Sequence, residues 1–524
     1  MYGIGMFMNR NAHLYPNRLA LVDETSELTY AQLHTSVNRL ANHLQQLGLE
    51  KGDRIGFLCD NCNQFVQMWL AAQKLGVVTV LLNYRLKPQE LARDLRRSRC
   101  KALLYTSKIR ENVLLGLTEE TPLKIIFTFG PGPLPQGHLD IDALCAVGDD
   151  SQIDADIQPG DWSTILYTSG STGLPKGVVR THRMIVEYAM QMAAEEEAYK
   201  TKHLSTISHS PLFHTGGLSM LMKMLVLGGT YVGVNGVDPV QIAALVQRYR
   251  INQVFFVPPA NIMRFVGVPE LGDYDLSTVE QVWATGGKLS PEYALAILDT
   301  FPNATLKTSY GASEFCAACS IRFDAPRTSL ETDPGIFEGA GYIGAFVDMK
   351  LVDEQGREVP DGELGEALVS SPFVMEGYLD DPEETAKVLT NGWYRTGDIF
   401  QKKNGIYYFV DRRSAMIKTG GENVYPTEVE CILRNHPDVM DCAVVGLPDS
   451  KWGEAIAAAV VCEPGKTVTP EILTAYCREN VASYKKPVYY LFLPELPMTA
   501  SGKIDRKALL DGEKYPFRHI KEEQ

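Results

Sequence analysis

Residues 167–177 bring together the groups that could hold a polyphosphate. The segment reads Tyr-Thr-Ser-Gly-Ser-Thr-Gly-Leu-Pro-Lys-Gly. Its candidate ligands are the hydroxyls, two of the glycines and the lysine, namely Thr168, Ser169, Gly170, Ser171, Thr172, Gly173 and Lys176. Glycine lets the backbone approach a ligand closely, and N–H groups, hydroxyls and a cation all suit phosphate oxygens. From this segment alone, a solvent-exposed Gly/Ser turn is the alternative.

The loop differs from the Walker A loop of P-loop NTPases. That pattern has glycine directly before its lysine and Ser or Thr directly after it. Here Pro175 precedes Lys176 and Gly177 follows it. Runs that favour β-structure flank the loop at residues 163–167 and 178–180. We therefore predict strand–loop–strand in place of strand–loop–helix, which disfavours a P-loop kinase or GTPase.

The loop, with motifs that follow it in order down most of the chain, resembles the adenylate-forming superfamily. That family contains acyl-CoA synthetases, adenylation domains of nonribosomal peptide synthetases and firefly-type luciferases. The chain is most similar to the acyl-CoA synthetases, which are AMP-dependent carboxylate–CoA ligases. The resemblance implies that the loop binds ATP phosphates and that Thr172 also contributes to a Mg²⁺ site.

Two further motifs resemble the family's nucleotide site. Gly286 and Gly287 match the segment beside the adenine, where a plain strand-to-helix turn is the alternative. Residues 310–314 read Tyr-Gly-Ala-Ser-Glu and match the family's Tyr-Gly-x-Thr/Ser-Glu. By this resemblance Tyr310, followed by Gly311, stacks on adenine. Ser313 bonds the α-phosphate and Glu314 ligates Mg²⁺, a metal that takes one or two carboxylates plus phosphate oxygens.

Residues 392–398, Gly-Trp-Tyr-Arg-Thr-Gly-Asp, match one of the family's most specific motifs. The resemblance assigns Asp398 to the ribose hydroxyls, because an ionised carboxylate only accepts hydrogen bonds and hydroxyls donate them. Arg412 resembles a second ligand of the ribose and phosphate. Many relatives carry Asp or Lys two residues later, as the hinge of a rotating small domain, but Ser414 stands here.

Two lysine motifs imply two half-reactions. Lys503, in Pro-Met-Thr-Ala-Ser-Gly-Lys-Ile at residues 497–504, matches the lysine that stabilises charge on phosphorus while the acyl-adenylate forms. Lys418, with Gly420 and Gly421, matches the segment that lines the pantetheine tunnel when CoA attacks. One site serving two transition states explains the domain rotation that the family implies.

The acid that would be activated is poorly determined by the sequence. The candidate pocket residues are His209, Phe213, His214, Gly217, Val257, Pro259, Ala284, Gly286, Ser309 and Phe315. They are mostly apolar or small, with no evident Arg or Lys to hold a second carboxylate. We therefore expect a fatty acid, with an aromatic or alicyclic acid as the alternative. A carboxylic acid is already ionised near neutral pH, so His214 is given no acid–base role.

Other functions remain open at this stage. A stand-alone enzyme that loads a carrier protein would share these motifs, although no carrier domain is visible downstream. A nucleotide- or acyl-binding protein without catalysis is a further alternative, which the presence of Lys503, Glu314 and Asp398 disfavours. The implied cosubstrates and cofactor are ATP, CoA and Mg²⁺.

The elements that must position these residues indicate an α/β fold. At 524 residues, the chain is too long for one compact core. We expect a large multi-layer α/β domain over residues 1–411 and a small, mobile α+β domain over 412–524. Helices are predicted around residues 30–44, 65–71, 291–300, 426–435 and 470–480. Strands are predicted at 53–58, 77–82, 253–257, 441–445, 456–461 and 488–493.

Composition places the chain among ordinary globular proteins, with 45% hydrophobic and 22% charged residues. A formal net charge of −14 argues against a nucleic-acid partner. We expect a cytoplasmic monomer or homodimer without a signal peptide or transmembrane helix. The ten cysteines include C-x-x-C pairs at 59–62 and 316–319, which we expect to be buried or half-buried free thiols and not a zinc or redox site.

Overall fold

The computed structural model describes residues 2–117, 121–153, 155–168, 175–196, 203–257, 260–449, 451–498 and 504–520. Its contacts divide the chain into two compact units. Unit 1 contains Met1–Met349 and Val369–Arg395, and unit 2 contains Lys350–Leu368 and Thr396–Gln524. The chain thus passes between the units three times, and the boundary expected between residues 411 and 412 stays a prediction.

Unit 1 contains a nine-stranded sheet. Its strands are β1 (Leu19–Val22), β2 (Glu27–Thr29), β10 (Ser205–Ser208), β11 (Thr230–Gly233), β12 (Gln253–Phe256), β13 (Gln281–Ala284), β14 (Thr305–Ala312), β15 (Cys316–Phe323) and β16 (Tyr342–Ile343). They are ordered β16-β15-β14-β13-β12-β10-β11-β1-β2. The central pairs are parallel, and the pairs at both ends are antiparallel.

A second, eight-stranded sheet carries the phosphate loop. Its strands are β3 (Arg54–Leu58), β4 (Val78–Leu81), β5 (Ala102–Thr106), β6 (Ile125–Phe129), β7 (Leu139–Asp140), β8 (Trp162–Thr168), β9 (Lys176–Thr181) and β19 (Gly377–Tyr378), ordered β19-β9-β8-β4-β3-β5-β6-β7. Every residue of β4 is buried, and β4 lies parallel to both neighbours, as its apolar sequence predicts.

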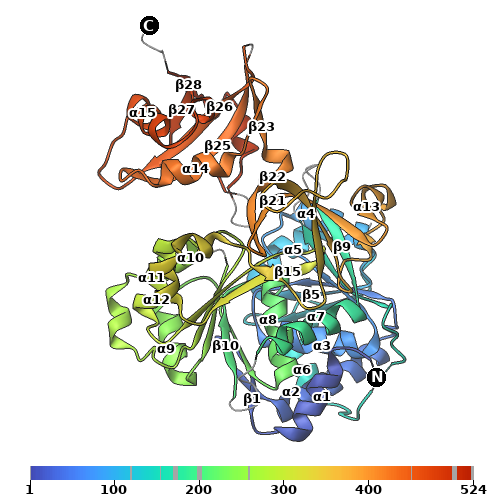
Figure 1. Cartoon of the computed structure of the whole chain (residues 1–524). Coiled ribbons are helices and arrows are strands. Elements are labelled where there is room, and N and C mark those ends of the chain that lie inside the picture. The colour runs from blue at the N-terminus through green and yellow to red at the C-terminus, as the bar shows by residue number, and fades with distance from the viewer. Residues whose placement is uncertain are drawn as a thin grey trace. The chain divides into compact units, whose positions relative to one another are not determined.

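Helices cover the two sheets of unit 1. They are α1 (Gly5–Leu14), α2 (Tyr30–Gln46), α3 (Asn63–Leu75), α4 (Pro88–Ser98), α5 (Arg110–Gly116), α6 (Ile141–Ala146), α7 (His182–Ala194), α8 (Thr215–Leu227), α9 (Pro239–Tyr249), α10 (Ala260–Phe265), α11 (Pro291–Thr300), α12 (Pro326–Thr332) and α13 (Pro382–Val388), with 3₁₀ turns η1 (Ser107–Ile109), η3 (Pro269–Asp273) and η4 (Pro334–Glu338). Helix α7 packs on β8 and β9, α8 packs on β10 and β11, and the two helices contact each other (Figure 1). The sheets therefore enclose a helical layer.

Helix α2 shows how local sequence builds these layers. Thr29 and Gln32 form a capping box at its N-terminus. Leu33, Val37 and Leu40 recur at helical spacing and are fully buried. The predicted helix at residues 30–44 is confirmed.

Unit 2 ends in a separate six-stranded sheet. Its strands are β23 (Ile417–Thr419), β24 (Glu422–Val424), β25 (Val439–Asp449), β26 (Gly453–Cys462), β27 (Tyr489–Phe492) and β28 (Arg518–His519). Its helices are α14 (Pro426–Arg434), α15 (Pro470–Asn480), η6 (Ser483–Lys485) and η7 (Ala508–Leu510). A smaller sheet contains β17 (Asp348–Val352), β18 (Leu364–Ser370), β20 (Leu389–Thr390), β21 (Trp393–Lys403) and β22 (Ile406–Arg412).

Alternating residues of β25 and β26 build two apolar clusters in this domain. Val444 and Ala458 belong to a cluster that also takes Val429 of α14 and Leu473 of α15. Their neighbours, such as Val445, belong to the other cluster. Period-2 alternation puts successive side chains on opposite faces, so this sheet is buried on both sides. The α/β fold expected from the sequence, with a large N-terminal and a small C-terminal domain, is confirmed.

Candidate active site

The phosphate loop joins two antiparallel strands. Thr168 ends β8 and is paired in register with Lys176, the first residue of β9. The Thr168 hydroxyl donates to the Lys176 carbonyl at 3.4 Å. The strand–loop–strand prediction is confirmed. Ser169, Gly170, Ser171, Thr172 and Gly173 lie outside the described residues.

Lys176 is held by two residues that sequence reasoning missed. Its Nζ lies 2.6 Å from Oε2 of Glu384 in α13 and 4.9 Å from the ring centroid of Tyr378. The Lys176 and Lys387 ammonium groups lower the pKa of Glu384 to about 2. Glu384 is therefore ionised near neutral pH and holds the Lys176 side chain in one place. The only local signal in the sequence was the acidic first turn of α13.

Glu314 lies in the turn between β14 and β15. One of its carboxylate oxygens accepts a hydrogen bond from the Tyr378 hydroxyl at 3.2 Å, and that hydroxyl lies 3.3 Å from the hydroxyl of Tyr394. Burial, and then the charge of Glu314, raise the pKa of Tyr378. Tyr378 therefore stays a neutral donor, and it connects the predicted metal ligand Glu314 with the predicted phosphate ligand Lys176.

The β14–β15 turn depends on a glycine. A Cβ on Gly311 would lie 1.9 Å from the carbonyl oxygen of Cys316. Only glycine allows the two strands to approach this closely. The same turn holds Ser313, whose Oγ accepts a hydrogen bond from the Thr215 hydroxyl at 3.1 Å.

The predicted adenine residues lie on neighbouring strands. Gly286 and Gly287 follow β13, and Tyr310 lies on β14, the next strand of the sheet. The Tyr310 ring packs 5.6 Å from the ring of Phe315. A half-exposed aromatic face beside a glycine turn is a suitable surface for a flat base.

The predicted acid-pocket residues form contacting pairs. The rings of Phe213 and His214 lie 4.5 Å apart at the start of α8. His209 accepts a hydrogen bond from the backbone N–H of Val257 at 3.3 Å. Burial lowers the pKa of His209 to about 4, so the ring is neutral near pH 7. Pro259 lies outside the described residues.

Ser309 leads to a buried charged cluster that the sequence did not reveal. Its hydroxyl accepts from the indole N–H of Trp283 at 3.2 Å. Over the Trp283 ring lie the ammonium groups of Lys307, at 4.2 Å, and Lys223, at 5.2 Å. Lys307 pairs with Glu195 at 2.5 Å, and Lys223 pairs with Glu196 at 2.9 Å. Buried charges need such partners, and here they surround the indole.

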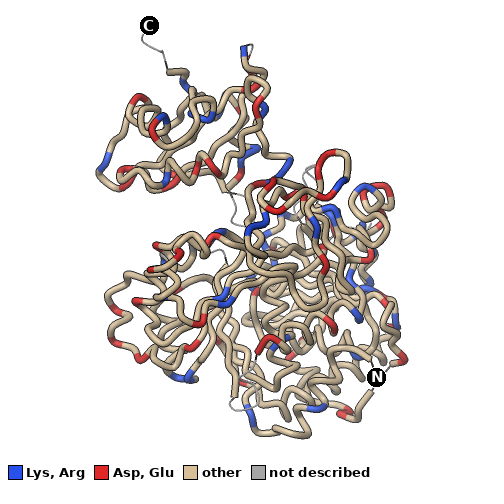
Figure 2. The backbone as a smooth tube through the Cα atoms, in the orientation of Figure 1, with Lys and Arg blue, Asp and Glu red and all other residues tan. Residues whose placement is uncertain are grey.

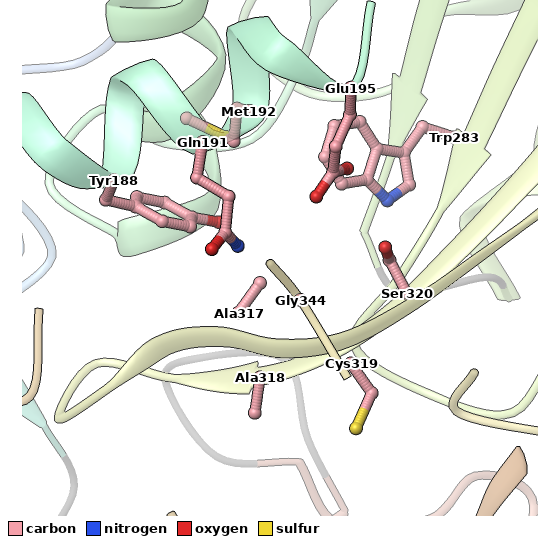
Figure 3. Close-up of a pocket in the computed structure, with 10 residues that line it drawn as sticks. All are labelled: Tyr188, Gln191, Met192, Glu195, Trp283, Ala317, Ala318, Cys319, Ser320 and Gly344. Atoms are coloured by element: carbon pink, nitrogen blue, oxygen red, sulfur yellow. The ribbon is translucent and has the colours of Figure 1, made fainter. Parts of the chain in front are cut away.

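A small cavity of about 10 Å³ adjoins this cluster. Figure 3 shows its lining: Tyr188, Gln191, Met192 and Glu195 from the α7 side, Trp283, and Ala317, Ala318, Cys319, Ser320 and Gly344. Room for about one water is too little for an extended chain. Its lining is mainly apolar, and none of the predicted acid-pocket residues belongs to it.

The predicted ribose residues of unit 2 come together on one hairpin. Asp398 of β21 is paired in register with Arg412 of β22, and Arg412 Nε lies 3.0 Å from an Asp398 carboxylate oxygen. Asp398 is 3% exposed. Ser414, the predicted hinge, lies in the 3₁₀ turn η5 (Arg413–Ala415) directly after β22.

The two predicted catalytic lysines differ in what surrounds them. Lys418 is exposed on β23, with its backbone N–H bonded to Glu454. Gly420 follows in the β23–β24 turn with φ 59°, a left-handed conformation that favours glycine. Gly421 stands beside it. Lys503 lies outside the described residues, and Arg506, three residues further on, forms a two-pronged ion pair with buried Glu430.

The cysteines and the acidic side chains are further possible metal ligands or redox groups. No group of three or more His, Cys, Asp or Glu side chains in the described chain is arranged around a metal position. Cys59, Cys62, Cys316 and Cys319 are free thiols, three of them buried and Cys62 half-buried, as the sequence predicted. Figure 2 shows acidic and basic residues interspersed along the chain, and no helix in its described part has the length and apolar character of a membrane span.

Comparison with known proteins shows the family to which this chain belongs. Residues 8–379 match the family model of AMP-binding enzymes, and residues 428–503 match that of the AMP-binding enzyme C-terminal domain. Feruloyl-CoA synthase of Amycolatopsis sp is 33% identical over 504 residues, which cover 96% of this chain and 97% of that protein. A fatty acid–[acyl-carrier-protein] ligase of Streptomyces coeruleorubidus is 31% identical over 505 residues, covering 95% and 93%. A solved anthranilate CoA ligase in complex with anthranoyl-AMP has a TM-score of 0.87 at 26% identity, covering 98% and 97%.

Proposed function

This chain belongs to the AMP-binding enzymes of the adenylate-forming superfamily, and from that premise we propose that it is an acid–CoA ligase working through an acyl-adenylate. The observation that carries the proposal is the cluster of Lys176, Tyr378 and Glu314 beside the phosphate loop. A cation, a neutral donor and a carboxylate at one place suit a metal-bound polyphosphate better than an isolated anion.

In the first half-reaction, a carboxylate oxygen of the acid attacks the α-phosphorus of ATP, and the bond to pyrophosphate breaks. The loop and Lys176 hold the departing phosphates, Ser313 holds the α-phosphate, and Lys503 offsets the charge that develops on phosphorus. Asp398 and Arg412 hold the ribose. The acid arrives ionised, so His209 and His214 shape the pocket and move no proton.

Glu314 is the described residue that would hold Mg²⁺, together with Thr172 of the loop. Its carboxylate is a hard oxygen donor, and Mg²⁺ uses one or two carboxylates with substrate phosphates. The oxygen donors of Glu314 and Thr172 therefore suit Mg²⁺. Bound Mg²⁺ supplies positive charge that offsets the phosphate oxygens.

In the second half-reaction, the CoA thiol sulfur attacks the acyl carbonyl, and the bond to AMP breaks. Lys418 and the glycines at 420 and 421 line the approach of the pantetheine. Rotation of residues 412–524 about Ser414 would move Lys503 away from the reacting groups and bring Lys418 to them. Small residues such as Ser414 can absorb the backbone change that rotation requires.

Two acid classes fit the site, and the charged cluster at Trp283 favours one of them. A long fatty chain extending past Ser309 would meet the ion pairs Lys223–Glu196 and Lys307–Glu195, of which all but Glu195 are buried, and separating such a pair is costly. A compact aromatic acid would end before them. We therefore favour an aromatic acid over the fatty acid expected from the sequence. Among the relatives, feruloyl-CoA synthase and the anthranilate ligase are named for aromatic acids, and the acyl-carrier-protein ligase is named for a fatty acid.

The experiment incubates the full chain with ATP, Mg²⁺, CoA and matched panels of aryl acids and C6–C16 fatty acids. We expect AMP and a thioester in equal amounts with at least one aryl acid, and slower turnover with fatty acids. Formation of ADP in place of AMP, or no thioester with any acid, contradicts the ligase proposal. Faster turnover of long fatty acids contradicts the aromatic assignment alone.

A carrier protein is the second acceptor to test, because one relative of similar length is a fatty acid–[acyl-carrier-protein] ligase. The same assay with holo-carrier protein in place of CoA shows which of the two acceptors the enzyme uses. Thioester on the carrier and none on CoA would replace our proposed acceptor. Light scattering on the same sample tests the expected monomer or homodimer.

A further inference from the structure

Arg180 is a fully buried cation beside the turn that holds Ser313. It lies on β9, four residues after Lys176, with 0% of its surface exposed. Its Nε and Nη2 donate to the backbone carbonyl of Ser313 at 3.1 and 2.6 Å, and Nη2 also donates to the Thr215 hydroxyl at 3.0 Å. Its Nη1 is buried without a hydrogen-bond partner, and within the described ranges no carboxylate forms an ion pair with it.

The chemistry of arginine sets the direction of the hydrogen bonds that follow. Arginine only donates, because its guanidinium keeps every proton at any pH a protein meets. Thr215 Oγ1 therefore accepts from Arg180 and gives its own proton to Ser313 Oγ, 3.1 Å away. The Ser313 oxygen already accepts a bond, so its proton is left to donate to a third group.

The third group must be a hydrogen-bond acceptor. Ser313 is half-exposed, in the turn that also carries Glu314. A chain of bonds that all point the same way is polarised along its length, which strengthens its last donor. A phosphate oxygen, charged and rich in lone pairs, is the acceptor that gains most from such a donor.

We propose that Arg180 and Thr215 are positioning residues that aim the Ser313 hydroxyl, as a donor, at a phosphate oxygen of the nucleotide. This inference rests on the proposed function, because it takes that nucleotide to be the adenylate. It adds two residues outside the loop to the phosphate site. The relay runs from Arg180 through Thr215 to Ser313 and then to the ligand.

The burial of Arg180 supports a ligand anion nearby. An ionised group removed from water without an opposite charge is costly unless other groups compensate it. A backbone carbonyl and a hydroxyl compensate part of the guanidinium charge, while Nη1 remains unpartnered. The alternative is a purely structural brace, in which Arg180 ties β9 to the Ser313 turn and to α8.

Calorimetry on the full chain with AMP and with adenosine separates these roles. The ratio of the two Kd values, adenosine over AMP, measures what the phosphate adds to binding. For Arg180→Met we expect this ratio to fall about tenfold, since a hydrogen bond to a charged group is worth at least that factor. Adenosine binding stays unchanged. A fall of both affinities by one common factor would show a structural brace and overturn the relay.

Thr215 provides a second test, in which one substitution removes the hydroxyl and another restores it. Thr215→Val keeps the shape and removes the hydroxyl, so the ratio should fall several-fold. Thr215→Ser restores the hydroxyl and the ratio. If Arg180→Met does not fold, this pair carries the test, and equal ratios for the valine and serine variants would overturn the proposal. Thr79→Val is the matched control, because Thr79 is a buried threonine of β4 whose hydroxyl bonds within the sheet.

A double variant tests whether Arg180 acts through Ser313. Ser313→Ala lowers the ratio, and we expect Arg180→Met to lower it no further in that background. An undiminished effect of Arg180→Met there would show direct action of its charge and overturn the relay. These measurements need no acid, so the relay can fail while acid-dependent AMP formation succeeds, and the ligase proposal can fail while AMP binding still reports on the relay.

Discussion

The residues proposed for the phosphates and those proposed for the two half-reactions are held in different ways. In unit 1, Lys176, Glu314 and Ser313 each bond to a neighbour whose own position is fixed by further contacts. In unit 2, Lys418 is exposed, and Arg412, although paired with Asp398, keeps 60% of its side chain exposed. The difference teaches that the proposed phosphate ligands are held in place before any ligand binds, whereas Lys418, proposed for one half-reaction only, stands exposed on a hairpin.

This contrast follows from the chemistry. Electrostatic stabilisation works best when donors and charges are fixed before the reaction, because they then need no reorganisation. A lysine needed in only one of two steps must instead be able to leave. The ion pair of Arg506 with Glu430 stabilises the fold of unit 2 three residues after Lys503 in the sequence.

The largest expected effect comes from Lys503. Lys503→Ala should slow acyl-adenylate formation by about 10²–10³-fold, as loss of one charge-stabilising donor does elsewhere. Thioester formation from a supplied acyl-adenylate should be unchanged, since that step does not use Lys503. Lys507→Ala, an exposed neighbour, is the control. Equal loss in both steps would contradict the division of labour.

Asp398 tests the proposed ribose site of unit 2. Asp398→Asn removes the carboxylate that is proposed to accept hydrogen bonds from the ribose hydroxyls and that pairs with Arg412. We therefore expect the KM for ATP to rise about tenfold or more. Asp361→Asn is the control, because Asp361 forms an exposed pair with Lys402 in the same unit. Similar KM values for both variants would remove Asp398 from the nucleotide site.

Glu384 tests preorganisation in unit 1, with a smaller effect. Glu384→Gln removes the charge that holds Lys176 in place, so the KM for ATP should rise by about two- to fivefold, the scale of a partly exposed ion pair. Because Glu384 has a pKa of about 2, this change should be constant between pH 5 and 8. Glu383→Gln, an exposed neighbour on α13, should have no effect. A lowered KM for Glu384→Gln would mean that Glu384 competes with the phosphates for Lys176, and it would contradict preorganisation.

The smallest expected effect concerns the stability of unit 1. Burial lowers the pKa of His182 to about 4, below its ordinary value of 6.5, so the unfolded chain binds the proton more readily. The free energy of unfolding should therefore fall as pH falls from about 6.5 to 4. His182→Leu should reduce this slope by up to about 1.4 kcal/mol per pH unit. Denaturant titrations at pH 7 and pH 5 measure it, with exposed His13→Gln as the control, and an unchanged slope would contradict this assignment.

Local features of the sequence predicted much of the fold. Pro175 and the β-rich flanks correctly excluded a P-loop, and the helix at residues 291–300 was predicted with its observed bounds. Period-2 and helical patterns located the strands and helices of the C-terminal domain. Each of these signals acts over a few residues, which is why one sequence suffices to read it.

The partners of the site residues could not be predicted in the same way. Lys176 and Glu384 are 208 residues apart, and Arg180 and Ser313 are 133 apart. Such pairs depend on which strands become neighbours, which local patterns do not determine. The usable local signals were the acidic first turn of α13 and a charged residue in the apolar run Val178-Val179-Arg180. The cations around Trp283 left no such signal.

The most direct test of the central claim is exchange of labelled pyrophosphate into ATP, measured without CoA. We predict exchange that requires both the carboxylic acid and Mg²⁺ and that needs no thiol, because the adenylate forms reversibly before CoA is used. Exchange that proceeds without any acid, or acyl-CoA formation by a chain that shows no exchange, would contradict an acyl-adenylate intermediate.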